Sequence, residues 1–139
     1  MAARMFRPVS FKLEPNVVDL YFEIAIGGTG APTATTGKCK GLYSITRTSA
    51  GLYVLTMGGP AGKDTYNRLL ACDVMFIPAS GVGTIVKTDV VSFASGNTLT
   101  ILCSAPTPGS PAVWPLIATD PGSGDTMMVH VALSNSKAS

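Results

Sequence analysis

The chain has 139 residues, which is the length of one domain with a substantial core. Charged residues make up 13% of it, against about 25% in an average soluble domain, and its net charge is only +2. This near-neutral balance gives no argument for nucleic-acid binding, and no apolar run approaches the ~18 residues of a membrane span. Because charge protects a surface against association, we expect partner proteins to cover much of this one. A charge-poor monomeric domain is the alternative.

The first 15 residues are predicted to form an extended arm ahead of a single domain at residues 16–139. Pro8 and Pro15 disfavour a helix, because each pushes the residue before it towards extended conformations. Four apolar residues of the arm alternate with polar or basic neighbours: Phe6, Val9, Phe11 and Leu13. This strand-like pattern predicts that the arm lies on a neighbouring subunit, as in edge-strand addition.

Cysteine usage and the N-terminus indicate a protein made in the cytoplasm. No uninterrupted apolar stretch follows Arg4 and Arg7, so no signal peptide is expected. The three cysteines show no CxxC spacing: Cys39, Cys72 and Cys103. We therefore expect free thiols. With a single histidine, His130, and no closely spaced ligand pairs, no metal site and no cofactor is predicted.

The first half of the domain reads as strands and turns. Residues 18–26 alternate apolar and polar side chains, which predicts a half-buried strand, and a loop rich in Gly and Thr follows to about Lys40. Residues 41–48 and 52–57 are rich in strand-forming side chains and are separated by a short turn containing Gly51. They are predicted to form a hairpin.

The second half continues in the same way. Further strands are predicted at residues 69–77, 85–93, 98–103 and 126–133, the second and third forming another hairpin. Five prolines lie between residues 106 and 121, which predicts a long ordered loop around Trp114, and residues 120–125 read as a turn. Seven or eight strands without a helix predict an all-β fold. We expect a jelly-roll-like antiparallel β-sandwich, with an immunoglobulin-like sandwich as the alternative.

No motif in the chain predicts catalysis. His130 lies in a strand pattern, and the chain has no nucleophile motif such as GxSxG. Asp120 and Asp125 flank the expected turn and lack the DxDxDG spacing of a calcium loop, so a turn role is preferred. The glycine-rich segment at residues 58–65 misses the phosphate-loop spacing by one residue. We therefore expect a protein that is not an enzyme.

Two segments resemble parts of small tailed-phage virion proteins. Residues 41–56 are similar to a recurrent hairpin of that group, in which a Ser-hydrophobic-Thr-Arg-Thr strand, a glycine-containing turn and a Tyr-hydrophobic-hydrophobic-Thr strand follow one another. Residues 118–126, followed by an apolar strand and Ser134-Asn135-Ser136, are similar to the ending of the same proteins. Together the two segments cover about a quarter of the chain.

This resemblance implies a capsid decoration, or cement, protein on the outer surface of a phage head. Its partners would be the major capsid protein and further copies of itself, as a dimer or trimer, without nucleic acid or membrane. A carbohydrate- or receptor-binding module of a head fibre or tail appendage is the alternative. We expect the partner contacts to come from the arm and the proline-rich loop, through Arg4, Phe6, Arg7, Phe11 and Trp114, although Trp114 can equally be a core residue.

Overall fold

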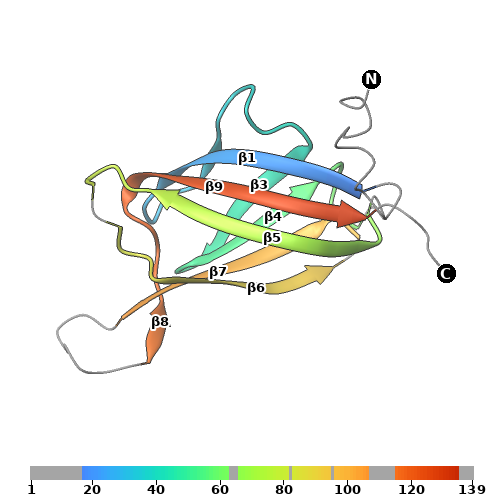
Figure 1. Ribbon diagram of the computed structural model, residues 1–139. Coiled ribbons are helices and arrows are strands. Elements are labelled where there is room, and N and C mark those ends of the chain that lie inside the picture. The colour runs from blue at the N-terminus through green and yellow to red at the C-terminus, as the bar shows by residue number, and fades with distance from the viewer. Residues whose placement is uncertain (1–16, 63–65, 82, 95, 107–114, 135–139) are drawn as a thin grey trace, which may run out of the picture.

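The computed structural model describes residues 17–62, 66–81, 83–94, 96–106 and 115–134. In these residues the chain forms strands and no helix, and the strands build two antiparallel sheets packed face to face (Figure 1). Within the same ranges, no helix long and apolar enough to cross a membrane is found. The prediction of an all-β antiparallel sandwich is confirmed.

Each sheet contains strands from both halves of the chain. The four-stranded sheet has the order β2 (Thr33–Ala34), β1 (Val17–Gly27), β9 (Ser123–Ser134) and β5 (Arg68–Ile77). The five-stranded sheet has the order β3 (Leu42–Ser49), β4 (Leu52–Met57), β7 (Thr98–Pro106) and β6 (Lys87–Ala94), and β8 (Leu116–Ala118) pairs with β7. The chain crosses between the sheets four times: after β2, β4, β5 and β8.

The core lies between the sheets and follows from the period of two in each strand. In β9, Met127, Val129, Val131 and Leu133 are buried, while the residues between them face outwards. In β1 the same alternation buries Phe22, Ile24 and Ile26. The five-stranded sheet contributes Tyr53, Leu55 and Met57 from β4, and Leu99, Ile101 and Cys103 from β7.

Both predicted hairpins are present, as β3–β4 and β6–β7. The structure adds two short strands that propensity did not indicate. β2 lies within the expected glycine-rich loop and pairs with β1, and β8 lies within the expected proline-rich loop and pairs with β7. β9 begins at Ser123, three residues before the predicted start at Thr126, because Ser123 pairs with Gly27. The predicted turn at residues 120–125 is therefore too long.

One side of the sandwich lies between two edge strands. Among the described strands, β5 pairs only with β9 and β6 pairs only with β7. Most of the large apolar side chains that are exposed in the described chain belong to these two strands or to the segment between them: Leu70, Met75, Ile77, Val86, Val90 and Val91. We call this part of the molecule the open side.

The turn between β3 and β4 packs closely against β7. Gly51 has a φ of 68°, and its carbonyl oxygen accepts a hydrogen bond of 2.8 Å from the amide of Cys103. A Cβ atom at Gly51 would overlap the carbonyl oxygen of Cys103 and the amide nitrogen of Thr119. The position therefore requires glycine both for its backbone conformation and for its lack of a side chain.

We expect Gly51→Ala to lower the free energy of unfolding by more than Gly62→Ala does. Gly62 also has a positive φ, of 86°, but a Cβ atom there would meet nothing within 4 Å. The left-handed conformation costs any L residue about 1–2 kcal/mol, and this cost is common to both variants. The steric clash is added to it at Gly51 alone of the two. Urea denaturation of the two variants measures the difference. Equal losses would show that the close approach to Cys103 contributes nothing.

Candidate functional site

The five partner-contact residues predicted from the sequence lie outside the described residues: Arg4, Phe6, Arg7, Phe11 and Trp114. Their role stays a prediction. In the described chain, exposed apolar or ionisable side chains gather on the outer face of the four-stranded sheet and on the open side.

The outer face of the four-stranded sheet carries a row of interacting side chains. Strand register places Tyr21 of β1 and Asp73 of β5 on either side of His130 in β9. The Tyr21 and His130 rings stack, with centroids 4.4 Å apart and planes 8° from parallel. His130 Nε2 lies 3.3 Å from Asp19 Oδ1, and Nδ1 lies 3.8 Å from Asp73 Oδ2. The ring of His130 is thus held from three sides.

This arrangement suits positioning better than metal binding. The two carboxylates approach opposite nitrogens of the His130 ring, so one metal ion could not be bound by His130 together with both Asp19 and Asp73. Across the described ranges, no group of three or more His, Cys, Asp or Glu side chains could hold a metal ion. Stacking on His130 instead fixes the ring of Tyr21, which lies on the exposed face of the sheet.

An apolar depression lies beside this row. It has a volume of about 320 Å³ and is lined on the outer face by Tyr21, Asp73, Met75, Met128 and His130. Tyr21 is 64% exposed and Met75 is 61% exposed. Aromatic and methionine side chains are enriched in the cores of protein interfaces, so this depression has the chemistry of a contact surface.

Tyr21 also borders a second depression, of about 310 Å³, which is more polar at its rim. Asp19, Lys38 and Lys40 contribute to its lining. Lys38 is itself held by Glu23 of β1, at 3.1 Å between Nζ and Oε2. The exposed tyrosine is therefore surrounded by carboxylate and ammonium groups, which can hydrogen-bond to a polar ligand.

Sequence reasoning missed this face, although part of its signal was present. Tyr21 lies on the polar side of the predicted strand at residues 18–26, together with Asp19 and Glu23. A large aromatic side chain in such a row indicates an exposed ring. Asp73 on β5 and His130 on β9 could not be found in the same way. Local alternation shows which face of a strand is buried, but it does not show which residues of two distant strands are paired.

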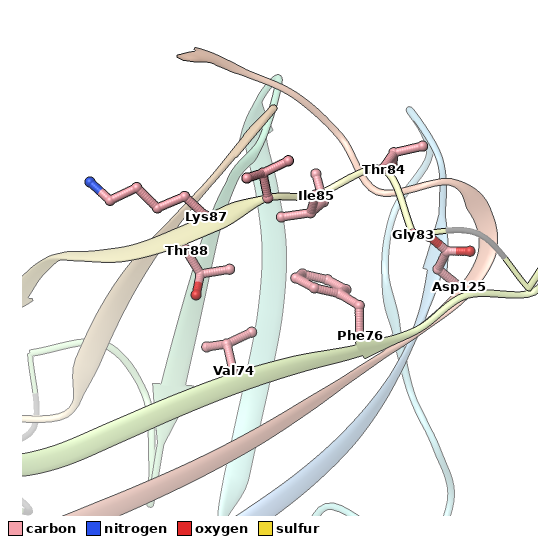
Figure 2. Close-up of a pocket in the computed structure, with 9 residues that line it drawn as sticks. Val74, Phe76, Gly83, Thr84, Ile85, Lys87, Thr88 and Asp125 are labelled. Carbon is pink, nitrogen blue, oxygen red and sulfur yellow. The ribbon is translucent and has the colours of Figure 1, made fainter. Parts of the chain in front are cut away.

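The open side holds a cavity of about 210 Å³ between the inner face of β5 and the segment that leads into β6. Figure 2 shows Val74 and Phe76 pointing towards Ile85 and Thr88 across this space. Val74 and Phe76 are paired with the buried Val129 and Met127 of β9, yet they remain only half-buried. The core is thus incompletely covered here.

A partly buried ion pair joins β3 to the segment that follows β8. Arg47 Nε donates to Asp120 Oδ1 at 2.8 Å, and Arg47 Nη2 donates to Oδ2 at 2.7 Å. Asp120 Oδ1 also accepts from the amide of Gly51 at 2.9 Å and from the hydroxyl of Tyr53 at 3.2 Å. These bonds lower the pKa of Asp120, chiefly through Arg47, while burial raises the pKa of Tyr53. Asp120 therefore joins the β3–β4 hairpin to the segment after β8.

Asp125 has a separate structural role. Its Oδ1 accepts from the amide of Ala79 at 2.9 Å, and its Oδ2 accepts from the amide of Gly122 at 2.9 Å. Asp120 and Asp125 thus satisfy different backbone and side-chain donors rather than converging on one ligand. Only the bond from Gly122 to Asp125 is local to the predicted turn, and the other contacts of the two carboxylates reach distant segments.

Comparisons with known proteins identify no relative. No family model matches the chain, and neither a curated protein nor a solved structure matches it.

We expect Asp120→Asn to lower the free energy of unfolding at pH 7 by more than the loss of an exposed ion pair does, because it leaves Arg47 without its charged partner in a partly covered site. The pKa of Asp120 is lowered by folding, so its contribution is complete above the unfolded-state value of about 3.9 and is lost as the pH falls through the folded-state value. Urea titrations of both proteins between neutral pH and about pH 2 should converge at the acid end.

The matched control is Asp89→Asn, which removes the exposed pair between Lys87 and Asp89. It should cost less than about 1 kcal/mol at pH 7. A loss in Asp120→Asn no larger than in this control would refute the structural role of the pair between Arg47 and Asp120.

Proposed function

We propose that this chain is a structural subunit of a phage virion that decorates the capsid and stabilises it by bridging major capsid protein subunits. The observation that carries the proposal is the uncovered apolar depression on the outer face of the four-stranded sheet, with Tyr21 and Met75 more than half exposed. The low charge of the whole chain and the resemblance of two segments to small phage virion proteins support it.

The depression has the composition of an interface core. Tyr21, Met75 and Met128 provide apolar surface, and Glu23 paired with Lys38 provides a polar rim beside it. Hot spots of protein interfaces are commonly aromatic residues set among contacts that exclude water. Stacking on His130 holds the Tyr21 ring in place before binding, which reduces the entropy lost when a partner covers it.

The proposed mechanism is mechanical bridging. A subunit that contacts two neighbouring capsid proteins adds buried area across the boundary between them. The shell can then break at that boundary only if these added contacts are also broken. Burial of apolar surface contributes roughly 25 cal/mol per Å², much of which is offset by lost freedom on association. Symmetric repetition over the shell multiplies each modest contact.

The two segments that resemble virion proteins meet in the structure through Arg47 and Asp120. Arg47 belongs to the first segment, and Asp120 belongs to the second. These two residues therefore make a structural contact within the sandwich. On this proposal the residues that bind the capsid lie elsewhere, on the outer sheet face, the N-terminal arm and the loop around Trp114.

The proposal places the subunit on the outer surface of the head after synthesis in the host cytoplasm. It assigns the chain no catalytic activity, cofactor, nucleic acid or membrane. Further copies of the chain, as a dimer or trimer, are the second proposed partner.

A second candidate function is binding of host carbohydrate by a fibre or tail module. The observation that favours it is the exposed Tyr21 ring, stacked on His130 and bordered by Asp19, Lys38 and Lys40. An aromatic face with hydrogen-bonding groups around it can hold a sugar ring. Among the described residues, Tyr21 is the one such ring exposed on this face, which makes protein contact the stronger proposal.

We expect the double variant Tyr21→Ala with Met75→Ala to lose at least tenfold in affinity for capsids assembled without this subunit. The loss follows from removal of the two most exposed apolar side chains of the depression, since a hot spot contributes about 2 kcal/mol or more. Sedimentation measures binding, cryo-EM shows whether the sites are ordered, and capsid melting reports the stabilisation.

The control is Tyr43→Ala, which removes a ring of similar exposure, 60%, from β3 of the other sheet. It should bind as the unaltered chain does. Failure of the unaltered chain to bind capsids at all would overturn the decoration proposal.

If carbohydrate binding is the function, host polysaccharide should shift the fluorescence of Trp114, the only tryptophan, in a saturable manner. Tyr21→Ala should then abolish saturation while Tyr43→Ala leaves it unchanged. A saturable response in the unaltered chain that depends on Tyr21 would favour this function over decoration.

A further inference from the structure

The open side has the two properties of a surface built to accept a strand. First, the outer edge of β5 has no partner among the described strands, so a row of backbone donors and acceptors is available. Second, the inner face of β5 is left half-covered at Cys72, Val74 and Phe76, although the residues paired with them in β9 are buried. A strand added to this edge would satisfy the backbone and complete the core.

We propose that residues 9–14 of a second copy of this chain add to β5 as an antiparallel strand, so that subunits associate by exchanging their N-terminal arms. This inference rests on the self-association part of the proposed function and does not involve the capsid. It names the occupant of the open side and the segment through which copies join.

The sequence of the arm suits this role. Six residues lie between Pro8 and Pro15, without a proline among them: Val9, Ser10, Phe11, Lys12, Leu13 and Glu14. Their apolar and polar side chains alternate strictly, and six residues is the usual length of a strand. Proline at either end is compatible with the start and end of a strand at an edge.

One antiparallel register matches the three apolar side chains of this segment, and Lys12, to β5. Leu13 pairs with Cys72, Phe11 with Val74 and Val9 with Phe76, so that the apolar residues of both strands face the core. The same register pairs Lys12 with Asp73 on the outer face, where the Asp73 side chain is 86% exposed. Opposite charges in directly paired positions stabilise a sheet.

The cavity at the open side fits the residue that this register brings to it. Phe11 would lie beside Val74, which together with Phe76 and Ile85 lines the cavity of about 210 Å³ (Figure 2). An apolar cavity of about 150 Å³ accepts a benzene ring in another protein, so the space is sufficient for one phenyl group.

The two neighbouring registers that keep the apolar face inwards are worse. A shift by two residues in one direction pairs Glu14 with Asp73 and so opposes like charges. A shift in the other direction pairs Arg7 with Phe76 and so turns a guanidinium towards the core. A parallel strand with Phe11 beside Val74 would place Lys12 next to Met75 and lose its carboxylate partner.

The chain's own arm cannot adopt the favoured register. Val17 and Arg68 both pair with Ser134, so they lie two strand spacings apart, or about 10 Å, and a strand outside β5 lies about 5 Å further away. In the favoured register, the residue opposite Arg68 would be residue 17, or residue 16 if the added strand follows the bulge between Leu69 and Ala71. Val17 is already paired with Ser134, and consecutive Cα atoms are only 3.8 Å apart, so neither residue can lie about 15 Å from the position of Val17 in β1. The arm must come from another copy.

The test is a disulfide trap that uses the native Cys72. In the variant Leu13→Cys, the new thiol would lie directly opposite Cys72, at the Cα separation of about 4.5–5.5 Å that a disulfide accepts. Burial raises the pKa of Cys72 to about 11, so the oxidation is run with oxidised glutathione at about pH 9. We expect a covalent oligomer on a non-reducing gel, with the 13–72 linkage identified by peptide mass spectrometry.

Lys12→Cys is the matched control, because it has the same reach but faces outwards, and it should give at least tenfold less linkage to Cys72. A monomer with an internal 13–72 disulfide would overturn the exchange by showing that the chain's own arm reaches β5. Absence of the linkage in a protein that is oligomeric by sedimentation would also overturn it.

A second measurement does not depend on an engineered disulfide. Sedimentation of Phe11→Ala should show an oligomer dissociation constant at least tenfold higher than that of the unaltered chain, while Ser10→Ala should leave it unchanged. Equal dissociation constants for Phe11→Ala and Ser10→Ala would overturn the proposal. Because no capsid is present in either assay, failure here is distinct from failure of capsid binding.

Discussion

The pairing of β9 with two partners along its whole length is the constraint on which the four-stranded sheet depends. β9 pairs with β1 on one side and with β5 on the other, and its alternating residues set both registers at once. Burying Val129 and Val131 on the inner face turns His130 outwards between Tyr21 and Asp73. A slip of one residue in the β1–β9 pairing would turn Tyr21 to the inner face, and a slip in the β5–β9 pairing would do the same to Asp73, so either slip would break the outer row.

The sequence predicted the strands better than their arrangement. Local alternation is sufficient to find β1, β4, β7 and β9, because alternate residues of these strands are buried against the other sheet. β3 and β6 have no buried residue and are found from their strand-forming residues and short turns. It is insufficient for β2 and β8, whose two or three residues are ordered only by pairing with β1 and β7. The exposure of Tyr21 could be anticipated from its strand face, whereas its contact with His130 depends on strands 109 positions apart in the chain.

The ion pair between Arg47 and Asp120 shows a second limit of prediction from sequence, which concerns contacts between distant segments. The two residues lie 73 positions apart, and no local pattern indicates that one bonds to the other. Asp120 reads locally as a turn residue, and the structure makes it the acceptor for a side chain 73 positions earlier. A residue that reads locally as part of a turn can therefore be held by a distant contact within the fold.

The pairing of β8 with β7 has a consequence for engineering. Pro106 and Leu116 are directly opposed in the antiparallel register, so the sheet itself fixes the two ends of the intervening segment at neighbouring positions. The entropy of closing a loop between fixed ends grows slowly, by about 0.6 kcal/mol for each doubling of its length. Foreign peptides could thus be displayed between these two residues with little effect on the sandwich, which would make the fold a carrier for epitopes.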